Sequence, residues 1–121
     1  MSTQKVLVVD DSLTQRMILA AILAEQGFEV VTANDGEEAV IKAKSEMPDL
    51  IVMDVVMPKL NGFQATRAIT TDEATWHIPV ILLTSKDMES DRIWGMRQGA
   101  TGFLHKPVDP EALIAMVTAL G

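Results

Sequence analysis

Short runs of apolar residues alternate with longer amphipathic segments along the whole chain. The first run, residues 5–10 (KVLVVD), is rich in valine and is bounded by charged residues, which is typical of a buried parallel strand. Four later runs have the same character. Together they predict strands over residues 5–10, 28–32, 50–54, 79–84 and 101–105.

The segments between these runs have helical spacing and helix-boundary residues. Ser12 is a suitable N-cap for a first helix that Gly27 ends, and Gly99 is suited to follow the end of the fourth helix. The remaining helices are expected over residues 37–45, 62–70, from Ser85 or Asp87 to Gln98, and over 110–120. In the first helix the expected buried stripe consists of Met17, Ile18, Ala21, Ile22 and Ala24.

Five alternations of strand and helix predict a parallel sheet with helices on both faces, an open doubly wound α/β fold. A chain of 121 residues without a Ser/Gly-rich linker predicts a single domain over residues 1–121. Apolar residues make up 48% and charged residues 22%, so a packed core is expected.

Charge and cysteine content narrow the function classes. Lys and Arg number 10 against 17 Asp and Glu, and the resulting net charge of −7 disfavours direct nucleic-acid binding. The absence of cysteine excludes disulfides and thiolate nucleophiles, and it is compatible with a reducing compartment. With no signal peptide and no apolar run of about 20 residues, we expect a cytoplasmic protein without membrane insertion.

Polar residues follow the predicted strands at the edge where ligands bind in open α/β sheets. They are Asp10, Asp11, Asp54, Thr84 and Lys106. Each aspartate alone is better explained as a turn or cap residue. Three carboxylates held together, however, resist full ionisation unless a cation lies among them, and hard oxygen ligands favour Mg²⁺, with Mn²⁺ as a substitute.

A cation, a lysine and a hydroxyl around a carboxylate suit phosphoryl transfer. The cation and Lys106 would neutralise phosphate oxygens while Thr84 donates a hydrogen bond. Asp54, at the end of the middle strand, is the best placed nucleophile, and a carboxylate attack would form an aspartyl phosphate.

Four motifs follow one another along the chain: VVDDS (8–12), DVVMPKLNG (54–62), LLTSKD (82–87) and LHKP (104–107). In this order and spacing they resemble the receiver domain of two-component response regulators, the CheY-like superfamily. This resemblance implies a flavodoxin-like sheet in the order 2-1-3-4-5. It also implies that Asp54 is the phosphoacceptor, that Asp10, Asp11 and the Val56 carbonyl complete a Mg²⁺ site, and that Lys106 contacts the phosphoryl group. Thr84 and Phe103 would be the switch residues, and Lys106–Pro107 a cis peptide.

Residues 62–67 and 85–100 are similar to the single-domain regulators of type IV pilus, chemotaxis-like systems, the PilH type. That likeness implies control of twitching motility by a CheA-like histidine kinase. The output would be the binding of a downstream protein to a surface formed by the fourth helix, fifth strand and fifth helix. The protein itself would be a monomer or a weak dimer. Such a protein is not an enzyme acting on other molecules, although it catalyses its own phosphorylation and dephosphorylation.

Positions 56 and 86 affect hydrolysis of the phosphoryl group in this family. Val56 and Lys86 carry neither a carboxylate nor a carboxamide that would orient the attacking water. We therefore expect a longer-lived phosphorylated state than in relatives with an amide at position 56.

Several features have an ordinary explanation beside a functional one. Core packing is favoured over a partner contact for Trp94, and Met88 and Met96 fit core filling as well as a recognition surface. Trp76 is expected to pack within its loop. His77 and His105 match no metal-ligand spacing, and His105 is expected to face outward.

Other functions stay open at this point. The protein could drain phosphate from the kinase, or act as a non-catalytic adaptor of the same fold. A haloacid dehalogenase type phosphatase would need a second acid two residues after Asp54, where Val56 stands. A nucleotide-binding module would need a glycine-rich first loop, and residues 10–16 contain no glycine.

Overall fold

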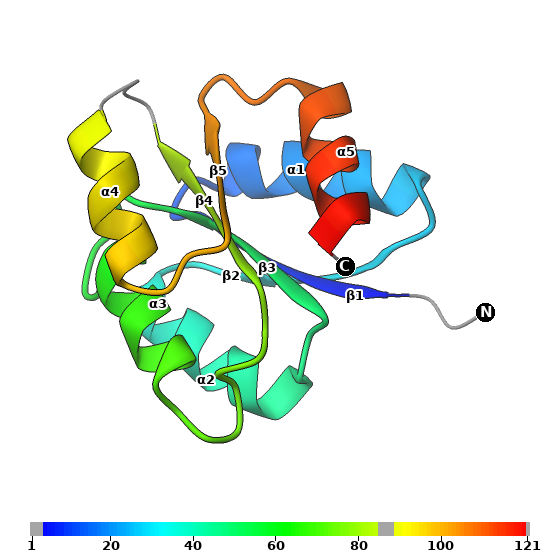
Figure 1. Ribbon diagram of the computed structural model, residues 1–121. Helices are drawn as coiled ribbons and strands as arrows, with labels where there is room; N and C mark the ends of the chain where they lie inside the picture. Colours follow the sequence, from blue (N-terminus) through cyan, green and yellow to red (C-terminus); the bar gives the residue numbers. More distant parts are fainter. Residues whose placement is uncertain (1–3, 85–88, 121) are drawn as a thin grey trace.

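The computed structural model, which describes residues 4–84 and 89–120, contains a five-stranded parallel sheet between two layers of helices (Figure 1). The strand order is β2-β1-β3-β4-β5, which confirms the predicted fold class. The strands are β1 (Lys5–Val9), β2 (Glu29–Ala33), β3 (Leu50–Asp54), β4 (Val80–Thr84) and β5 (Gly102–His105). The helices are α1 (Leu13–Glu25), α2 (Gly36–Glu46), α3 (Gly62–Thr70), α4 (Glu89–Arg97) and α5 (Pro110–Leu120).

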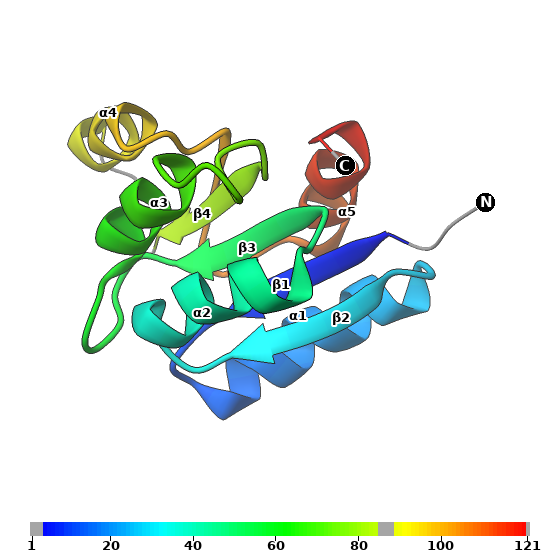
Figure 2. The same ribbon diagram turned by 90° about the horizontal axis from the view of Figure 1, so that it is seen from below.

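Each face of the sheet has its own apolar core, because alternate residues of a strand point to opposite faces. Helices α1 and α5 cover one face, where Leu19 and Leu113 are fully buried against Val8. Helices α2 and α3 cover the other, where Ala43 and Ile69 lie in the same cluster as Leu7 and Ile51. Figure 2, seen from below, shows α2 and α3 in front of the sheet and α1 behind it. The central strands β3 and β4 are buried along their whole length, which explains their uninterrupted apolar sequences.

The predicted boundaries agree with the structure to within one or two residues where residues are described. Strand β1 ends at Val9 and not at Asp10, β2 is shifted by one residue, and β4 and β5 begin one residue later than expected. The start of the fourth helix at Ser85 or Asp87 lies outside the described residues. Gly99 follows α4 with a φ of 105°, as expected for a glycine that ends a helix.

The predicted buried stripe of α1 is wrong except at Ile22, which is partly buried and packs against the core. Met17 is 63% exposed and Ile18 is also exposed, whereas Leu19 and Leu23 are buried. The helix is apolar nearly all round, so periodicity alone could not select the face that meets the sheet and α5. No helix within residues 4–84 and 89–120 is long and apolar enough to cross a membrane.

Candidate functional site

The carboxyl ends of β1, β3, β4 and β5 bring the predicted site residues to one edge of the sheet. Asp10 directly follows β1, Asp54 is the last residue of β3 and Thr84 is the last residue of β4. Parallel pairing places these ends side by side, since Val9 pairs with Met53 and Asp54 with Leu83. Lys106 follows β5, and its backbone N–H donates to the Thr84 carbonyl at 2.7 Å.

The three aspartates form a compact group of hard oxygen ligands. One carboxylate oxygen from each of Asp10, Asp11 and Asp54 lies within 4.8 Å of the other two. Asp10 and Asp54 are buried, while Asp11 is exposed and leaves one side of the group open to solvent. Spacing of this kind, with room for water ligands, fits Mg²⁺, which prefers carboxylates and retained waters.

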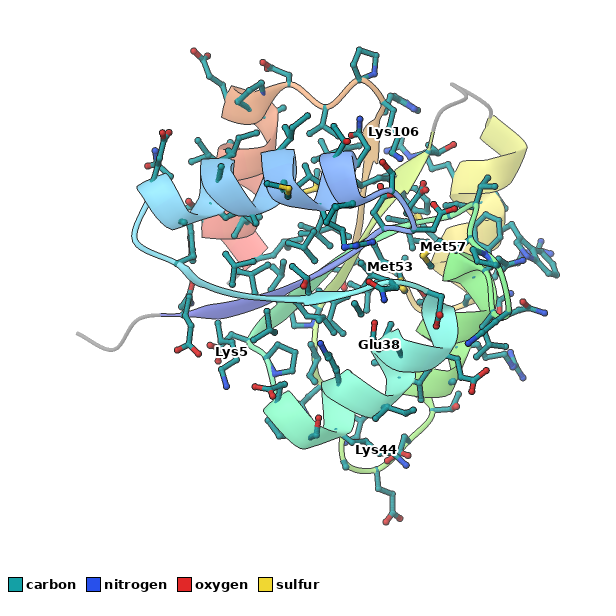
Figure 3. All side chains as sticks on the ribbon, turned by 180° about the vertical axis from the view of Figure 1, so that it is seen from behind. Lys5, Glu38, Lys44, Met53, Met57 and Lys106 are labelled. Carbon is teal, nitrogen blue, oxygen red and sulfur yellow. The ribbon has the colours of Figure 1, made fainter. Side chains whose placement is uncertain are left out.

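Lys106 lies between the two buried carboxylates. Its Nζ is 3.0 Å from Asp10 Oδ2 and 3.3 Å from Asp54 Oδ2. Figure 3 shows Lys106 at the end of β5 beside the start of α1, with Lys5 at the opposite end of the sheet. The Lys106–Pro107 peptide bond is cis, as expected. One ammonium cannot neutralise three carboxylates, so the site keeps a surplus of negative charge that a divalent cation would balance.

Burial and neighbouring charge oppose one another at Asp54. Burial raises the pKa of its carboxyl, and Asp10 raises it further, whereas the charge and hydrogen bond of Lys106 lower it; the net direction is upward. At Lys106 burial acts to lower the pKa, but the hydrogen bond to Asp10 and the charges of both aspartates raise it above its ordinary value. The lysine is therefore a fixed positive charge beside Asp54.

Two residues that the sequence analysis missed hold this site in place. The Arg16 Nη1 on α1 donates to the Asp10 carbonyl at 2.7 Å, and so ties the β1–α1 loop to the helix. Gly62 begins α3 so close to β3 that an added Cβ would lie 2.5 Å from the Asp54 carbonyl oxygen. The signal for Arg16 was its place on the first turns of α1, close in sequence to Asp10 and Asp11.

Of the other predicted site residues, Thr84 lies at the same edge, whereas Phe103 lies two residues before the carboxyl end of β5. Thr84 is buried at the end of β4, and Phe103 is half-buried on β5 against the core cluster shared with α2 and α3. Val56 follows Asp54 by two residues and its side chain is exposed. Lys86 lies outside the described residues.

Comparison with known proteins agrees with this geometry. Residues 6–118 match the family model described as the response regulator receiver domain. The chain belongs to the response regulator receiver domain family. It is therefore a receiver domain of two-component signalling, with the CheY-like fold that the four motifs implied.

Known relatives of this receiver domain include Protein PilH, a chemotaxis protein and a receiver domain of a histidine kinase. It is 49% identical over 116 residues to Protein PilH of Pseudomonas aeruginosa, covering 96% of both chains. The chemotaxis protein CheY4 of Vibrio cholerae superposes with a TM-score of 0.94 at 36% identity, over 99% of this chain and 100% of that one. The receiver domain of the sensor histidine kinase PA1611 from Pseudomonas aeruginosa, solved with magnesium coordinated in its active-site cleft, has a TM-score of 0.90 at 30% identity, with 98% of each chain covered.

The structure corrects the expectations for both tryptophans of the receiver domain. Trp94 is 51% exposed on α4, so the favoured prediction of core packing is wrong, and Met96 beside it is exposed as well. Trp76 is 63% exposed in the α3–β4 loop, where its ring meets that of His77 edge-on at 5.9 Å. Met88 lies outside the described residues, and His105 is exposed as expected.

Proposed function

We propose that this receiver domain accepts a phosphoryl group on Asp54 and signals by a phosphorylation-dependent change of its surface. The observation that supports this most strongly is the group formed by Asp54, two further aspartates and Lys106 at one edge of the sheet. A carboxylate nucleophile beside a fixed ammonium is the arrangement that phosphoryl transfer to an aspartate requires.

The proposed reaction moves one phosphoryl group from a phosphohistidine of the kinase to this chain. An Asp54 oxygen attacks phosphorus in line, the P–N bond breaks, and the imidazole leaves with the bonding pair and takes up a proton. Lys106 balances charge on the phosphoryl oxygens, and Thr84 turns its hydroxyl toward them. Phe103 follows Thr84, and the exposed surface changes with it.

Asp10, Asp11, Asp54 and the Val56 carbonyl would hold the metal ion. Mg²⁺, or Mn²⁺ in its place, would supply electrostatic shielding between the donor phosphate and the acceptor carboxylate. The domain then catalyses its own phosphorylation and dephosphorylation without acting on other substrates.

The proposed setting is a chemotaxis-like system that controls type IV pili. It rests on the likeness to PilH and on the fold shared with CheY4. A CheA-like histidine kinase would be the phosphoryl donor, and α4, β5 and α5 would present the surface for a downstream protein. We further propose that residues 1–121 act as a single receiver domain in the cytoplasm, with drainage of phosphate from the kinase as an alternative output.

Incubation with Mg²⁺ and acetyl phosphate, followed by mass measurement, tests the acceptor assignment. We expect one added phosphoryl group on the native chain and none on Asp54→Asn. Asp72→Asn, which changes an aspartate in the α3–β4 loop, is the matched control and should be modified like the native chain. Full modification of Asp54→Asn would refute the assignment.

The lifetime proposal concerns Val56, whose exposed side chain offers no group that could orient water. Val56→Asn should shorten the half-life of the phosphorylated state several-fold, measured by loss of the added mass after the phosphodonor is removed. Slower or unchanged dephosphorylation would contradict the proposed role of this position.

A further inference from the structure

Among the α4 residues whose side chains are described, 92–97, few are buried. Between residues 92 and 97 only Gly95 is buried, while Ile93, Trp94 and Met96 are exposed together with both arginines of this stretch. By contrast, α3 buries Ala65, Thr66 and Ile69 against the sheet. Figure 1 shows α4 at the outer edge of the sheet beside β4 and β5. Over residues 92–97, α4 therefore meets the sheet through a glycine.

The ring of Phe103 lies directly against Gly95. A Cβ added at position 95 would be 2.2 Å from Phe103 Cζ and 2.8 Å from its Cε1, and 3.1 Å from Leu82 Cδ1. Carbon atoms cannot approach so closely, so any larger residue forces the ring or the helix to move. Glycine is less favourable than alanine inside a helix, and its presence here is explained by the room that it leaves for the ring.

A second contact fixes the carboxyl end of α4. The Thr70 hydroxyl on α3 has one proton to donate, and the carbonyl oxygens of Gln98 and Thr66 each lie 2.8 Å from it. A Cβ added at Gly99 would lie 2.6 Å from the same hydroxyl oxygen. This end of α4 thus has a polar contact with α3, whereas one turn earlier the helix packs against the apolar ring of Phe103, a contact that has no hydrogen-bond geometry to fix it.

Phe103 connects this apolar contact to the phosphorylation site. It pairs with Leu82 across β4 and β5, and two residues further along the same strands Thr84 pairs with His105. The ring of Phe103 is therefore only two residues away from the strand ends at the site. A shift of the carboxyl end of β4 or β5 would displace the ring through this short stretch of strand.

We propose that Gly95 is a positioning residue of the switch, because the space above it lets the Phe103 ring set the position of α4 and of its exposed Ile93, Trp94 and Met96. This inference rests on the proposed phosphorylation of Asp54. When the Phe103 ring moves away from Gly95, α4 loses this contact and shifts toward the sheet. When the ring moves back, it fits against α4 only if residue 95 is glycine. Alanine there uncouples the ring from the helix.

A double-mutant cycle tests the contact without any phosphorylation. Gly95→Ala should lower the urea midpoint of the native chain, because the added Cβ collides with Phe103. In a Phe103→Ala background the same change should leave the midpoint unchanged or raise it, because alanine is the better helix former once the ring is gone. Equal losses in both backgrounds would overturn the proposed contact.

Trp94 reports on the position of α4. The chain has two tryptophans and no tyrosine, so Trp76→Phe, a change at an exposed position, leaves Trp94 as the only strong fluorophore. Acetyl phosphate and Mg²⁺ should shift the Trp94 emission in this variant. The shift should be lost when Gly95→Ala is added and kept when the control Arg97→Ala, an exposed position on α4, is added instead.

Mass measurement on the same samples separates the two proposals. Each variant should carry one phosphoryl group, because Gly95 does not touch Asp54. An unchanged Trp94 spectrum in the phosphorylated Trp76→Phe protein, or a full shift in the presence of Gly95→Ala, would overturn the role of Gly95. Absence of the phosphoryl group from all variants would instead refute the proposed function, and the stability cycle would then decide the Gly95 contact alone.

Discussion

Asp54 shows how a functional residue can oppose the stability of its own fold. Its carboxylate is buried beside Asp10, and Lys106 supplies one positive charge for the pair. Burial of a charge that is only partly compensated is unfavourable, and the upward direction of the Asp54 pKa expresses that cost. The proposed roles of Asp54 as nucleophile and metal ligand would explain why an aspartate stands at this position.

Asp54→Asn should therefore stabilise the metal-free protein at neutral pH, by about 1 kcal/mol. Because folding raises the pKa of Asp54, the folded state binds this proton more tightly than the unfolded chain. Its stabilising contribution is present at low pH and is lost as the pH rises through the raised pKa. Asp54→Asn avoids that loss because its amide does not ionise. Urea unfolding in the presence of EDTA, at about pH 3.5 and about pH 7, measures the difference in free energy of unfolding between the variant and the native chain.

The gain from Asp54→Asn should nearly vanish at the acidic pH, where the native carboxyl is protonated and resembles the amide. Asp72→Asn is again the control, and its behaviour should be the opposite. Contact with Lys44 lowers the pKa of Asp72, an exposed group, so removing its charge cannot stabilise the protein at neutral pH. An equal gain for Asp54→Asn at both pH values would contradict the assigned cause.

Among the helices, α3 has an N-terminal cap that directly affects the loop of the site. Asn61 and Gln64 form a reciprocal capping box, with the Asn61 side chain accepting from the Gln64 N–H at 2.8 Å and the Gln64 side chain accepting from the Asn61 N–H at 2.9 Å. Gly62 N–H donates to the Val55 carbonyl at 2.8 Å. The cap thus ends the loop that begins at Asp54 and carries Val56.

Asn61→Ala should lower the free energy of unfolding by about 1 kcal/mol, because the N-cap acceptor is lost. It should also weaken Mg²⁺ binding, since the loop that carries Val56 is then less well fixed. Urea unfolding measures the first effect and Mg²⁺ titration the second. Unchanged Mg²⁺ affinity in Asn61→Ala would show that the cap has only a structural role.

Two substitutions in α1 test which of its faces is buried. Leu23→Ala should cost about 2–5 kcal/mol, because it opens a cavity in the core shared with α5. Met17→Ala should change the free energy of unfolding by less than about 0.5 kcal/mol, because Met17 lies on the exposed face. Denaturant midpoints of both variants decide between the observed face and the stripe that the sequence predicted.

At the scale of the whole molecule, metal binding should stabilise the native state. A ligand that binds only the folded protein adds about 2.7 kcal/mol at a concentration one hundred times its Kd. Thermal unfolding with Mg²⁺ and with EDTA should show a higher Tm with the metal, and Asp10→Asn should abolish most of this difference. Retention of the full Mg²⁺ effect in Asp10→Asn would remove Asp10 from the proposed ligand set.

Much of this arrangement could be predicted from the sequence because it depends on local pattern. Buried strands must be apolar, caps such as Ser12 satisfy backbone groups nearby, and parallel strands must end at a common edge. Those rules predict that Asp10, Asp54, Thr84 and Lys106 lie together at one edge of the sheet. The order of the strands was implied by the family resemblance and is confirmed by the structure.

The strands, the helices and the residues that meet at the sheet edge follow from the sequence, since hydrophobic periodicity and the residues at strand ends are local properties. The buried face of an evenly apolar α1 and the exposure of Trp94 follow only from the tertiary fold. It alone also placed Arg16 on the Asp10 carbonyl and Phe103 against Gly95. These outcomes depend on contacts between segments far apart in the chain or across a tight turn. The hydrophobic periodicity of a single segment therefore cannot predict them.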